Sequence, residues 1–295
     1  MSETVASLRH KMASAGELEA VVRTMKGMAA SSIGQYENAV RSLDEYYRTV
    51  ELGLAACFQQ AEWINVGMRT PQRETAAIGV VVFGSDQGLV GQFNEVMVDF
   101  VTTTLTKLPG HKMLWAVGER IQSRLADTAL PALHSFPLPN SIGAITALVG
   151  NILIEVESQR EKGNLSQVHI FHNRPQTGAI YRSVSQRLLP LDEVWRHNLA
   201  MTAWPTQRLP EVMHGNDQTL PALIREYLFV SIFRACAESL ASENASRLAA
   251  MQRAGKNIDE LQGNLHRTFH RLRQSGIDEE LFDVISGFEA LTESG

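Results

Sequence analysis

The sequence predicts an α/β fold with long terminal helices, in which N- and C-terminal helices form an antiparallel left-handed coiled coil and flank a small, mostly parallel α/β domain. All ten prolines lie between Pro71 and Pro221, so the two ends lack the residue that most strongly breaks a helix. Apolar residues recur at helical steps at both ends, and strand-like and helix-like segments alternate between them. We predict a coiled-coil helix over 1–70, an α/β domain over 71–216 and a second coiled-coil helix over 217–295.

An apolar stripe runs along the N-terminal segment. Its members follow one another every three or four residues, at a mean spacing of about 3.5, the repeat that keeps a seam facing its partner in a left-handed coiled coil. At about 1.5 Å per residue, the predicted helix is on the order of 80 Å long. The stripe comprises Val5, Leu8, Met12, Ala15, Leu18, Val22, Met25, Ala29, Ile33, Tyr36, Val40, Leu43, Tyr47, Val50, Leu54 and Cys57.

A second stripe runs along the C-terminal segment and predicts a helix of roughly 100 Å, so we expect the two stripes to bury each other. Glycines at 16, 27, 34, 255, 263 and 276 predict close helix crossings or local play, because each costs a helix roughly 1 kcal/mol against alanine. Periodicity alone leaves an ordinary helical core open. The stripe comprises Leu220, Ile224, Tyr227, Leu228, Ile232, Cys236, Leu240, Leu248, Met251, Ile258, Leu261, Leu265, Phe269, Leu272, Ile277, Leu281, Ile285 and Phe288.

The central segment alternates between strand and helix patterns. Short β-branched or aromatic runs bounded by turn residues are typical of buried strands, and longer amphipathic runs of helices. We predict strands at 78–84, 113–117, 168–172 and 181–189, helices at about 94–107 and 142–161, turns at 85–88 and 174–178, and a link over 192–217. This alternation indicates a mostly parallel sheet, with the last strand antiparallel.

Composition excludes several classes of protein. A net charge of -5 and a pI near 6.0 give no basic excess for binding nucleic acid. Two distant cysteines, Cys57 and Cys236, indicate a reducing compartment without a disulfide framework. No apolar run approaches the roughly 20 residues of a membrane-spanning helix. The N-terminus resembles neither a signal nor a transit peptide, so we expect the mature protein to start near Met1 in a bacterial-type cytoplasm.

The candidate chemical motifs are weak, and we expect no catalytic residue, cofactor or metal site. The segment 84–91, GSDQGLVG, matches neither the dinucleotide fingerprint nor the P-loop pattern. His266 and His270 are four residues apart, but no third metal ligand is evident. Ser85 lacks the setting of a nucleophile elbow. Asp86 and the pair 279–280 are explained by turn chemistry and surface charge.

Four segments resemble those of a known family. Residues 24–30 read TMKGMAA, similar to AMKMVAA, and residues 85–94 read SDQGLVGQFN, similar to SDRGLCGGLN. Residues 238–251 read ESLASENASRLAAM, similar to ENLASEHAARMVAM, and residues 273–291 read RQSGIDEELFDVISGFEAL, similar to RQAxITxELxEIxSGAxAL. With these segments, the chain resembles the gamma subunit of F-type ATP synthases over essentially its whole length.

The resemblance implies a central rotating stalk that couples the membrane ion-driven ring to ATP synthesis or hydrolysis without catalysing either. It implies as partners the alpha and beta subunits of the catalytic hexamer, the epsilon subunit and the rotor c-ring, at the cytoplasmic face of the bacterial inner membrane. As an asymmetric shaft turns, it stabilises a different conformation at each catalytic site, so that rotation and nucleotide affinity are reciprocally coupled.

The same resemblance implies contacts with the catch loops of the beta subunits at Met25 and Lys26 in the first helix and at Arg273, Gln274 and Glu280 in the last. The sequence also departs from the family pattern. Gly27 stands where methionine is usual, and Asp278 where threonine is usual. These departures are consistent with a divergent or alternate copy of the synthase subunit.

Two other classes of function stay open at this point. A nucleotide-binding α/β enzyme would use the turn that contains Ser85 and Asp86, and the isolated chain would bind a nucleotide saturably. A coiled-coil scaffold unrelated to ATP synthesis would self-associate through the terminal stripes. Co-purification with alpha and beta subunits separates the rotor from both alternatives.

Overall fold

The computed structural model describes residues 4–59, 76–202, 204, 206 and 216–292. The chain divides into two compact units. We call Ala29–Arg247 the sheet unit, and Met1–Met28 with Leu248–Gly295 the coil unit. The elements, in chain order, are α1 (Val5–Gln59), β1 (Ala77–Phe83), α2 (Phe93–Leu105), β2 (Lys112–Val117), α3 (Glu119–Ala126), β3 (His134–Phe136), α4 (Ile142–Glu161), β4 (Leu165–Gln176), β5 (Ala179–Leu189), α5 (Glu193–Ala200) and α6 (Asn216–Thr292).

The sheet unit is built on a five-stranded sheet in the order β3-β2-β1-β4-β5. β1 is central and pairs in parallel with β2 and β4, with Val81 opposite Trp115 on one side and Ile170 on the other. β3 extends the parallel sheet beyond β2, whereas β5 pairs with β4 antiparallel. The predicted mostly parallel sheet with an antiparallel last strand is therefore confirmed.

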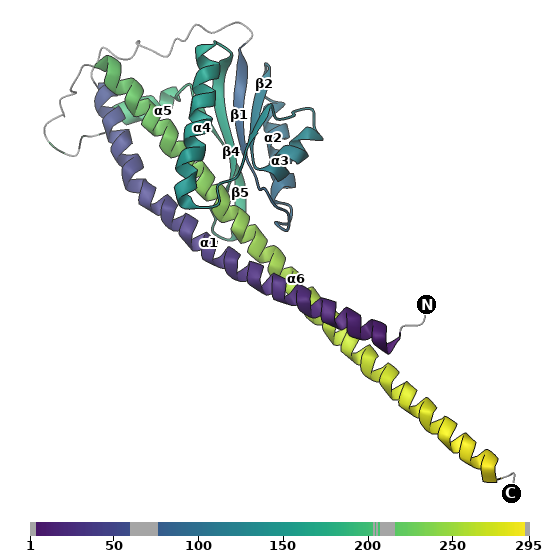
Figure 1. Cartoon of the computed structure of the whole chain (residues 1–295). Helices are drawn as coiled ribbons and strands as arrows, with labels where there is room; N and C mark the ends of the chain where they lie inside the picture. Colours follow the sequence, from purple (N-terminus) through teal and green to yellow (C-terminus); the bar gives the residue numbers. More distant parts are fainter. Residues whose placement is uncertain (1–3, 60–75, 203, 205, 207–215, 293–295) are drawn as a thin grey trace. The chain divides into compact units, whose positions relative to one another are not determined.

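The side chains of β1 explain why the sheet lies between two layers of helices. Successive strand residues point to opposite faces. Val80 and Val82 pack into a cluster with apolar side chains of α2 and α3. Val81 and Phe83 pack into a larger cluster that includes α4, α1 and α6. Within this unit, α4 and α6 lie on one side of the sheet, and α2 and α3 on the other (Figure 1).

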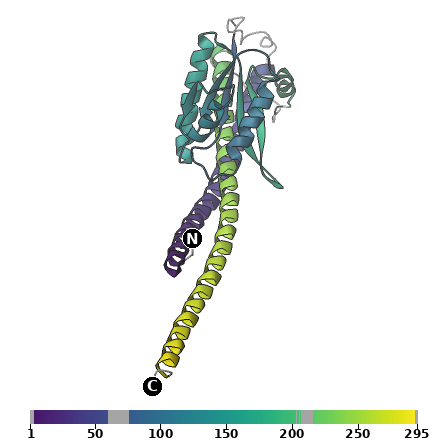
Figure 2. The ribbon, with the colours of Figure 1, turned by 90° about the vertical axis from the view of Figure 1, so that its right-hand side faces the viewer.

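Local signals set the ends of several central elements. The Ser141 hydroxyl accepts from the backbone N–H of Ala144 at the start of α4, and Asp192 accepts from Trp195 N–H at the start of α5. Gly178 takes a φ of +83° in the turn between β4 and β5. These two strands are longer than their neighbours, and their hairpin projects from the end of the sheet (Figure 2).

α1 and α6 run antiparallel within the sheet unit. The Tyr46 hydroxyl donates to Glu226 Oε2 at 2.7 Å, and a Cβ added at Gly53 would lie 3.0 Å from the Leu223 side chain. Asp44 forms an ion pair with Arg234 at 3.2 Å. Contacts further along α1 thus meet earlier residues of α6, which confirms the predicted antiparallel pairing.

The coil unit pairs the other parts of the same two helices in the same sense. Leu8 and Ala15 of α1 form a small apolar cluster with Leu265 of α6. Nearer the middle of α1, Gln262 donates to Glu19 at 3.1 Å. The left-handed sense of the predicted supercoil stays a prediction.

The predicted mutual burial of the stripes is wrong for part of the coil unit. Leu18 is 55% exposed, and Ile277, Leu281 and Ile285 are 53%, 58% and 44% exposed. α1 begins at Val5, and its first turns already pack against α6 near Leu265, so α6 continues beyond the end of its partner. Phe288 lies among residues whose side chains are not described.

The glycines that the sequence analysis singled out in the two long helices do not mark close crossings. A Cβ at Gly16, Gly27, Gly34, Gly263 or Gly276 would meet nothing within 4 Å, and at Gly255 only Val22 at 3.9 Å. The predicted close crossings are therefore wrong at these positions. Each of these positions has room for a side chain. The other part of the prediction, local flexibility of the helices at these glycines, stays a prediction.

The sequence missed three short elements, α3, β3 and α5, of which α5 falls within the predicted link. Each has eight residues or fewer, too short for a clear periodicity. The predicted domain boundary at 70/71 lies outside the described residues. Among the helices that the structure describes, none is both long enough and apolar enough to cross a membrane.

Candidate functional site

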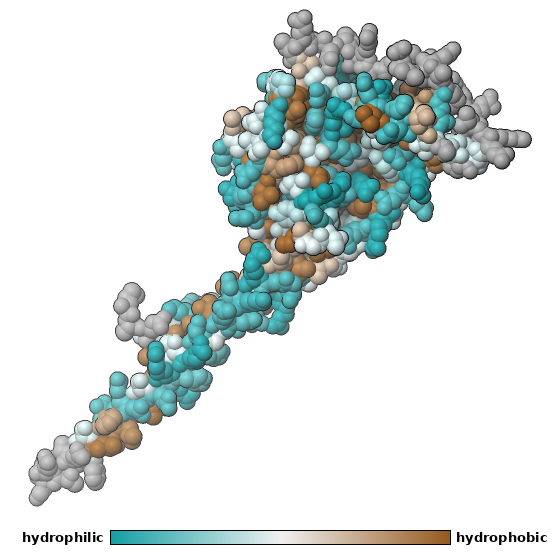
Figure 3. Space-filling view, turned by 180° about the vertical axis from the view of Figure 1, so that it is seen from behind, coloured by the Kyte–Doolittle hydropathy of each residue, from teal (hydrophilic) through white to brown (hydrophobic). Residues whose placement is uncertain are grey.

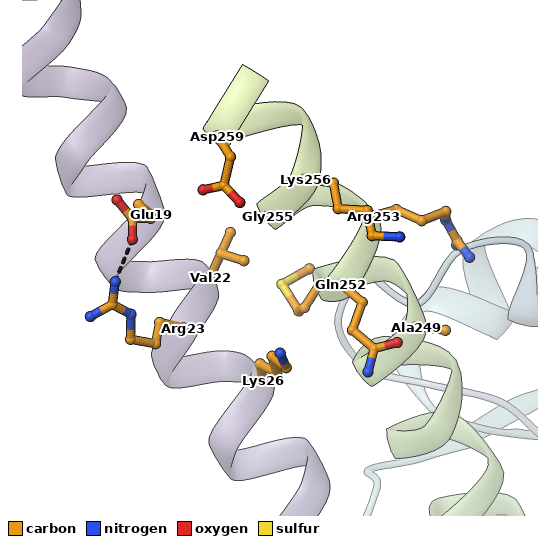
Figure 4. Close-up of a pocket in the computed structure, with 11 residues that line it drawn as sticks. Glu19, Val22, Arg23, Lys26, Ala249, Gln252, Arg253, Gly255, Lys256 and Asp259 are labelled. Carbon is orange, nitrogen blue, oxygen red and sulfur yellow. Dashed lines mark hydrogen bonds and ion pairs between the residues drawn. The ribbon is translucent and has the colours of Figure 1, made fainter. Parts of the chain in front are cut away.

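A groove between α1 and α6 in the coil unit contains one of the predicted contact positions. Lys26 is exposed and lines the groove, while its neighbour Met25 is half-buried. Val22 and Asp259 point into the groove from the two helices (Figure 4). The groove encloses about 610 Å³ and is lined by Glu19, Val22, Arg23, Lys26, Ala249, Met251, Gln252, Arg253, Gly255, Lys256 and Asp259.

The charges that line the groove are mostly positive. Arg23 forms an ion pair with Glu19, and the hydrogen bond from Gln262 followed by that from Arg23 lowers the pKa of Glu19. Lys26 and Arg253 form no ion pair with any residue that the structure describes. Their cations are therefore available to an acidic group from outside the chain.

The other predicted contacts lie further along α6. Arg273, Gln274 and Glu280 are all exposed, with Arg273 directly following Leu272, which packs against the cluster around Leu8. They lie at least about 20 Å of helix from the groove, at about 1.5 Å per residue. The structure thus places the five predicted positions in one unit but does not bring them to one site.

The end of α6 presents apolar side chains to solvent. Phe282 is 68% exposed and Val284 70% exposed, in addition to the stripe residues already described. Figure 3 shows apolar side chains at the surface next to the grey C-terminal residues. A cluster of large exposed apolar side chains is typical of an interaction surface.

The polar groups of Ser85 and Asp86, in the turn after β1, form hydrogen bonds within the chain. Ser85 is fully buried, and its backbone N–H donates to Asn94 Oδ1 at 3.0 Å. The carboxylate of Asp86 accepts from the backbone N–H groups of Glu119 and Leu138. A Cβ at Gly84 would lie 2.2 Å from Ile121, so only glycine fits there. These side chains hold the turn against α3, which is a structural role.

A buried polar network that sequence reasoning missed joins β4 to α6 in the sheet unit. Glu238 Oε2 accepts from His172 Nε2 and from Arg174 Nε, both at 2.7 Å. Its other oxygen accepts from Arg234 Nε at 2.9 Å, and Arg234 also pairs with Asp44 of α1. The side chains of His172 and Glu238 are only 1% and 5% exposed.

The protonation states in this network follow from burial and hydrogen bonding. Burial lowers the pKa of His172 and outweighs the carboxylate beside it, so the ring is neutral and its Nε2–H donates. Burial alone would raise the pKa of Glu238, but hydrogen bonds from His172, Arg234 and Arg174 outweigh it and hold that pKa at about 2. Glu238 is therefore ionised at neutral pH.

A second buried glutamate on α6 behaves in the opposite way. Burial raises the pKa of Glu243 to about 7, although Arg247 acts against that shift, and Asp86 adds to it. Arg247 Nη2 lies 2.6 Å from Glu243 Oε1, while Glu243 Oε2 has no hydrogen-bond partner among the residues described. Polar residues inside an apolar helix stripe, as in ESLASENAS, are the signal that could have located both groups.

Comparison with known proteins places these features in a family. A family model described as ATP synthase matches residues 4–291. The ATP synthase gamma chain of Arthrobacter sp. (strain FB24) is 25% identical over 300 residues, with 100% of both chains covered. That of Pasteurella multocida is 23% identical over 295 residues, covering 96% of this chain and 98% of the relative.

Solved structures share the fold. A chain of the rotor of Euglena gracilis mitochondrial ATP synthase superposes with a TM-score of 0.62 at 14% identity, covering 92% of this chain and 98% of that chain. A chain from the OSCP/F1/c-ring structure of the same organism gives 0.66 at 16% identity, covering 98% and 94%. Since the family model spans almost the entire sequence and the relatives match it end to end, the chain belongs to the ATP synthase gamma-chain family.

Proposed function

We propose that this chain is the central rotating stalk of an F-type ATP synthase, which couples rotation of a membrane ion-driven ring to ATP synthesis or hydrolysis at sites on other subunits. The observation that carries the proposal is its membership of the gamma-chain family over residues 4–291. The paired antiparallel helices α1 and α6 supply a shaft, because two helices packed on each other resist bending better than either alone. The chain itself performs no bond chemistry.

We also propose its place in the assembly. Its partners are the alpha and beta subunits of the hexamer, the epsilon subunit and the c-ring, at the cytoplasmic face of a bacterial inner membrane. Functionally the chain has an N-terminal coiled-coil helix (1–70), a central α/β domain (71–216) and a C-terminal coiled-coil helix (217–295). Two structures of the same fold, one from the rotor and one from the OSCP/F1/c-ring structure of a mitochondrial ATP synthase, support this placement.

Within this assembly, Met25, Lys26, Arg273, Gln274 and Glu280 contact the catch loops of the beta subunits. Their exposure on the coil unit supports the proposal, since four of the five side chains are exposed and Met25 is half-buried. The unpaired charge of Lys26 and the apolar end of α6 offer two different kinds of contact. We propose that these residues act in torque rather than in assembly.

Co-expression with alpha and beta subunits tests the main proposal. We expect a stable alpha-beta-gamma complex with ATPase activity and a rotating gamma chain. A chain that purifies alone, or that self-associates through its helices, contradicts the rotor function.

The double variant Arg273→Ala/Gln274→Ala tests the contact residues within that complex. We expect lower rotation-coupled ATPase with assembly intact. Arg271→Ala is the matched control, because Arg271 is also exposed but lies about 200° around the helix from Arg273, at about 100° per residue. Equal torque in the double variant and the control refutes the assignment of Arg273 and Gln274.

A further inference from the structure

One face of α6 carries polar residues that contact the end of the sheet. Glu238, Ser242 and Ser246 are four residues apart, which places them one above another on a helix. All three are buried, with exposures of 4%, 0% and 5%. We call these three residues the polar seam. They lie in the sheet unit, inside one of the four segments that resemble the family.

Each member of the polar seam bonds to a different point at the end of the sheet. Glu238 binds His172 and Arg174 of β4 at 2.7 Å. Ser242 Oγ donates to the carbonyl oxygen of Asn173 at 3.1 Å. Ser246 Oγ donates to the carbonyl oxygen of Val90, in the turn after β1, at 2.6 Å. The seam therefore ties two turns of α6 to the carboxyl ends of the two central strands.

Apolar packing and hydrogen bonds hold α6 to the sheet in different ways. Leu240 and Cys236 pack in the large core cluster, and such packing resists separation of the two surfaces. The hydrophobic driving force is itself non-directional. Hydrogen bonds require a defined distance and angle, and charge-assisted bonds in a buried setting are the strongest of them.

The Glu238 network also involves the second helix. Arg234 donates to Glu238 Oε1 and forms an ion pair with Asp44 on α1. One carboxylate thus connects β4, α6 and, through Arg234, α1. Since three hydrogen-bond donors outweigh burial and hold the carboxylate ionised, the connection persists across the physiological pH range.

We propose that Glu238, Ser242 and Ser246 are positioning residues that fix the rotational register of α6 against the sheet, so that torque passes between the sheet and the helices without slip. This inference rests on the proposed rotor function. It assigns a mechanical role to the polar positions of the segment ESLASENAS, which the overall function leaves unexplained.

Single-molecule rotation with the probe attached to the sheet tests the inference. In the alpha-beta-gamma complex, ATP hydrolysis turns the helices, and a probe on the sheet reports the torque that passes from the helices to the sheet. Lys107→Cys supplies an exposed attachment point in the sheet unit, and the native Cys57 and Cys236 are buried, so labelling is selective. Rotation is recorded against increasing viscous drag, with the ATPase rate measured in parallel.

We expect Ser242→Ala/Ser246→Ala to lose torque on the probe while the ATPase rate stays at its unmodified value, and Glu238→Gln to lose more. Ser239→Ala is the matched control, since Ser239 is equally buried on α6 but its hydroxyl has no hydrogen-bond partner among the described residues. Leu240→Ala is the second control, because it weakens the core without touching the seam. Both controls should keep full torque.

The outcomes separate the two proposals. Full torque in the double serine variant and in Glu238→Gln overturns the polar seam and leaves the rotor function standing. Equal torque loss in Leu240→Ala also overturns it, because general destabilisation then explains the effect. If the unmodified chain forms no rotating complex with alpha and beta subunits, the proposed function itself fails. The double serine variant retains the apolar core and the Glu238 network, so it reports on the seam even where Glu238→Gln does not fold.

Discussion

α6 is largely buried in the sheet unit and largely exposed in the coil unit, whereas α1 has a continuous buried run only at 54–57, near its end in the sheet unit. In the sheet unit, Leu54 and Leu240 are 0% and 3% exposed, because the sheet and α4 cover the faces of α1 and α6 that do not contact each other. In the coil unit, Leu18 and Leu261 occupy equivalent stripe positions and are 55% and 47% exposed. A helix pair alone covers only a narrow seam on each member. Burial of a stripe residue thus depends on a third surface as much as on the heptad pattern.

The largest effect should come from removing the charge that the sheet unit buries. Glu238→Ala leaves His172, Arg174 and Arg234 without their acceptor, and breaking a buried pair on one side costs about 3–5 kcal/mol. Urea unfolding of the sheet unit, followed by hydrogen exchange in β4, measures this loss. Glu280→Ala, at an exposed position of the coil unit, should change stability by less than about 0.5 kcal/mol. Similar losses in both variants would contradict the contrast between the units.

Two leucines on one helix sharpen the comparison. Leu240→Ala removes a side chain from the large core, so it should cost about 2–5 kcal/mol. Leu261→Ala, at a 47% exposed position of the same helix, should cost less than about 1 kcal/mol. Denaturant unfolding of the two variants under identical conditions makes the test. A loss at Leu261 as large as that at Leu240 would show that the coil unit buries its stripe in solution.

The pH dependence of stability should differ in sign between the two buried glutamates. The pKa of Glu243 is raised from 4.5 to about 7, so its contribution is fully present below pH 4.5 and lost as pH rises through 7. The pKa of Glu238 is lowered to about 2, so its contribution is present above pH 4.5 and lost as pH falls through 2. The Glu243 effect is on the order of 3 kcal/mol at most.

Comparison of the unmodified chain with Glu243→Gln isolates that contribution. The unmodified chain should lose unfolding free energy relative to Glu243→Gln as pH rises from 4.5 to 7, because only the glutamate ionises. Carbon-13 NMR of the side-chain carboxyl measures its titration directly. A carboxyl whose pKa is at its ordinary value would show that Arg247 fully offsets the effect of burial.

The smallest effects should come from glycine substitutions on α1. Gly27→Ala in the coil unit should stabilise the helix by about 1 kcal/mol, because its Cβ meets nothing within 4 Å. Gly53→Ala in the sheet unit should gain less, because its Cβ would lie 3.0 Å from Leu223. Thermal unfolding of the two variants gives the comparison. Equal gains at both positions would show that Leu223 moves aside freely.

Much of the fold was predictable from residue patterns. The runs at 78–84 and 113–117 correspond to β1 and β2, and the amphipathic run at 142–161 coincides with α4. These segments are long or strongly apolar, so their periodicity is clear. β3 and α3 could not be recognised, because three or eight residues with mixed polarity carry no such signal. Their positions depend on strands that pair with them in space.

The candidate sites were predictable only in part. Resemblance pointed to Lys26 and Arg273, and both are exposed, but the groove beside Lys26 is formed with residues of α6 more than 200 positions away in the sequence. Glu238 was missed because its partners on β4 are about 65 residues distant. A polar residue in an apolar stripe shows that a partner is needed without showing which one.

The sequence by itself determined that two long helices would form and pair in opposite directions, because proline-free apolar periodicity is a local property of the chain. It also determined a parallel sheet between them, through the alternation of strand and helix patterns. Only the tertiary structure decided which parts of the stripes are buried, which glycines have room, and where Glu238 finds its donors. These properties depend on what packs across from each residue, and that neighbour is set by the whole fold rather than by adjacent sequence.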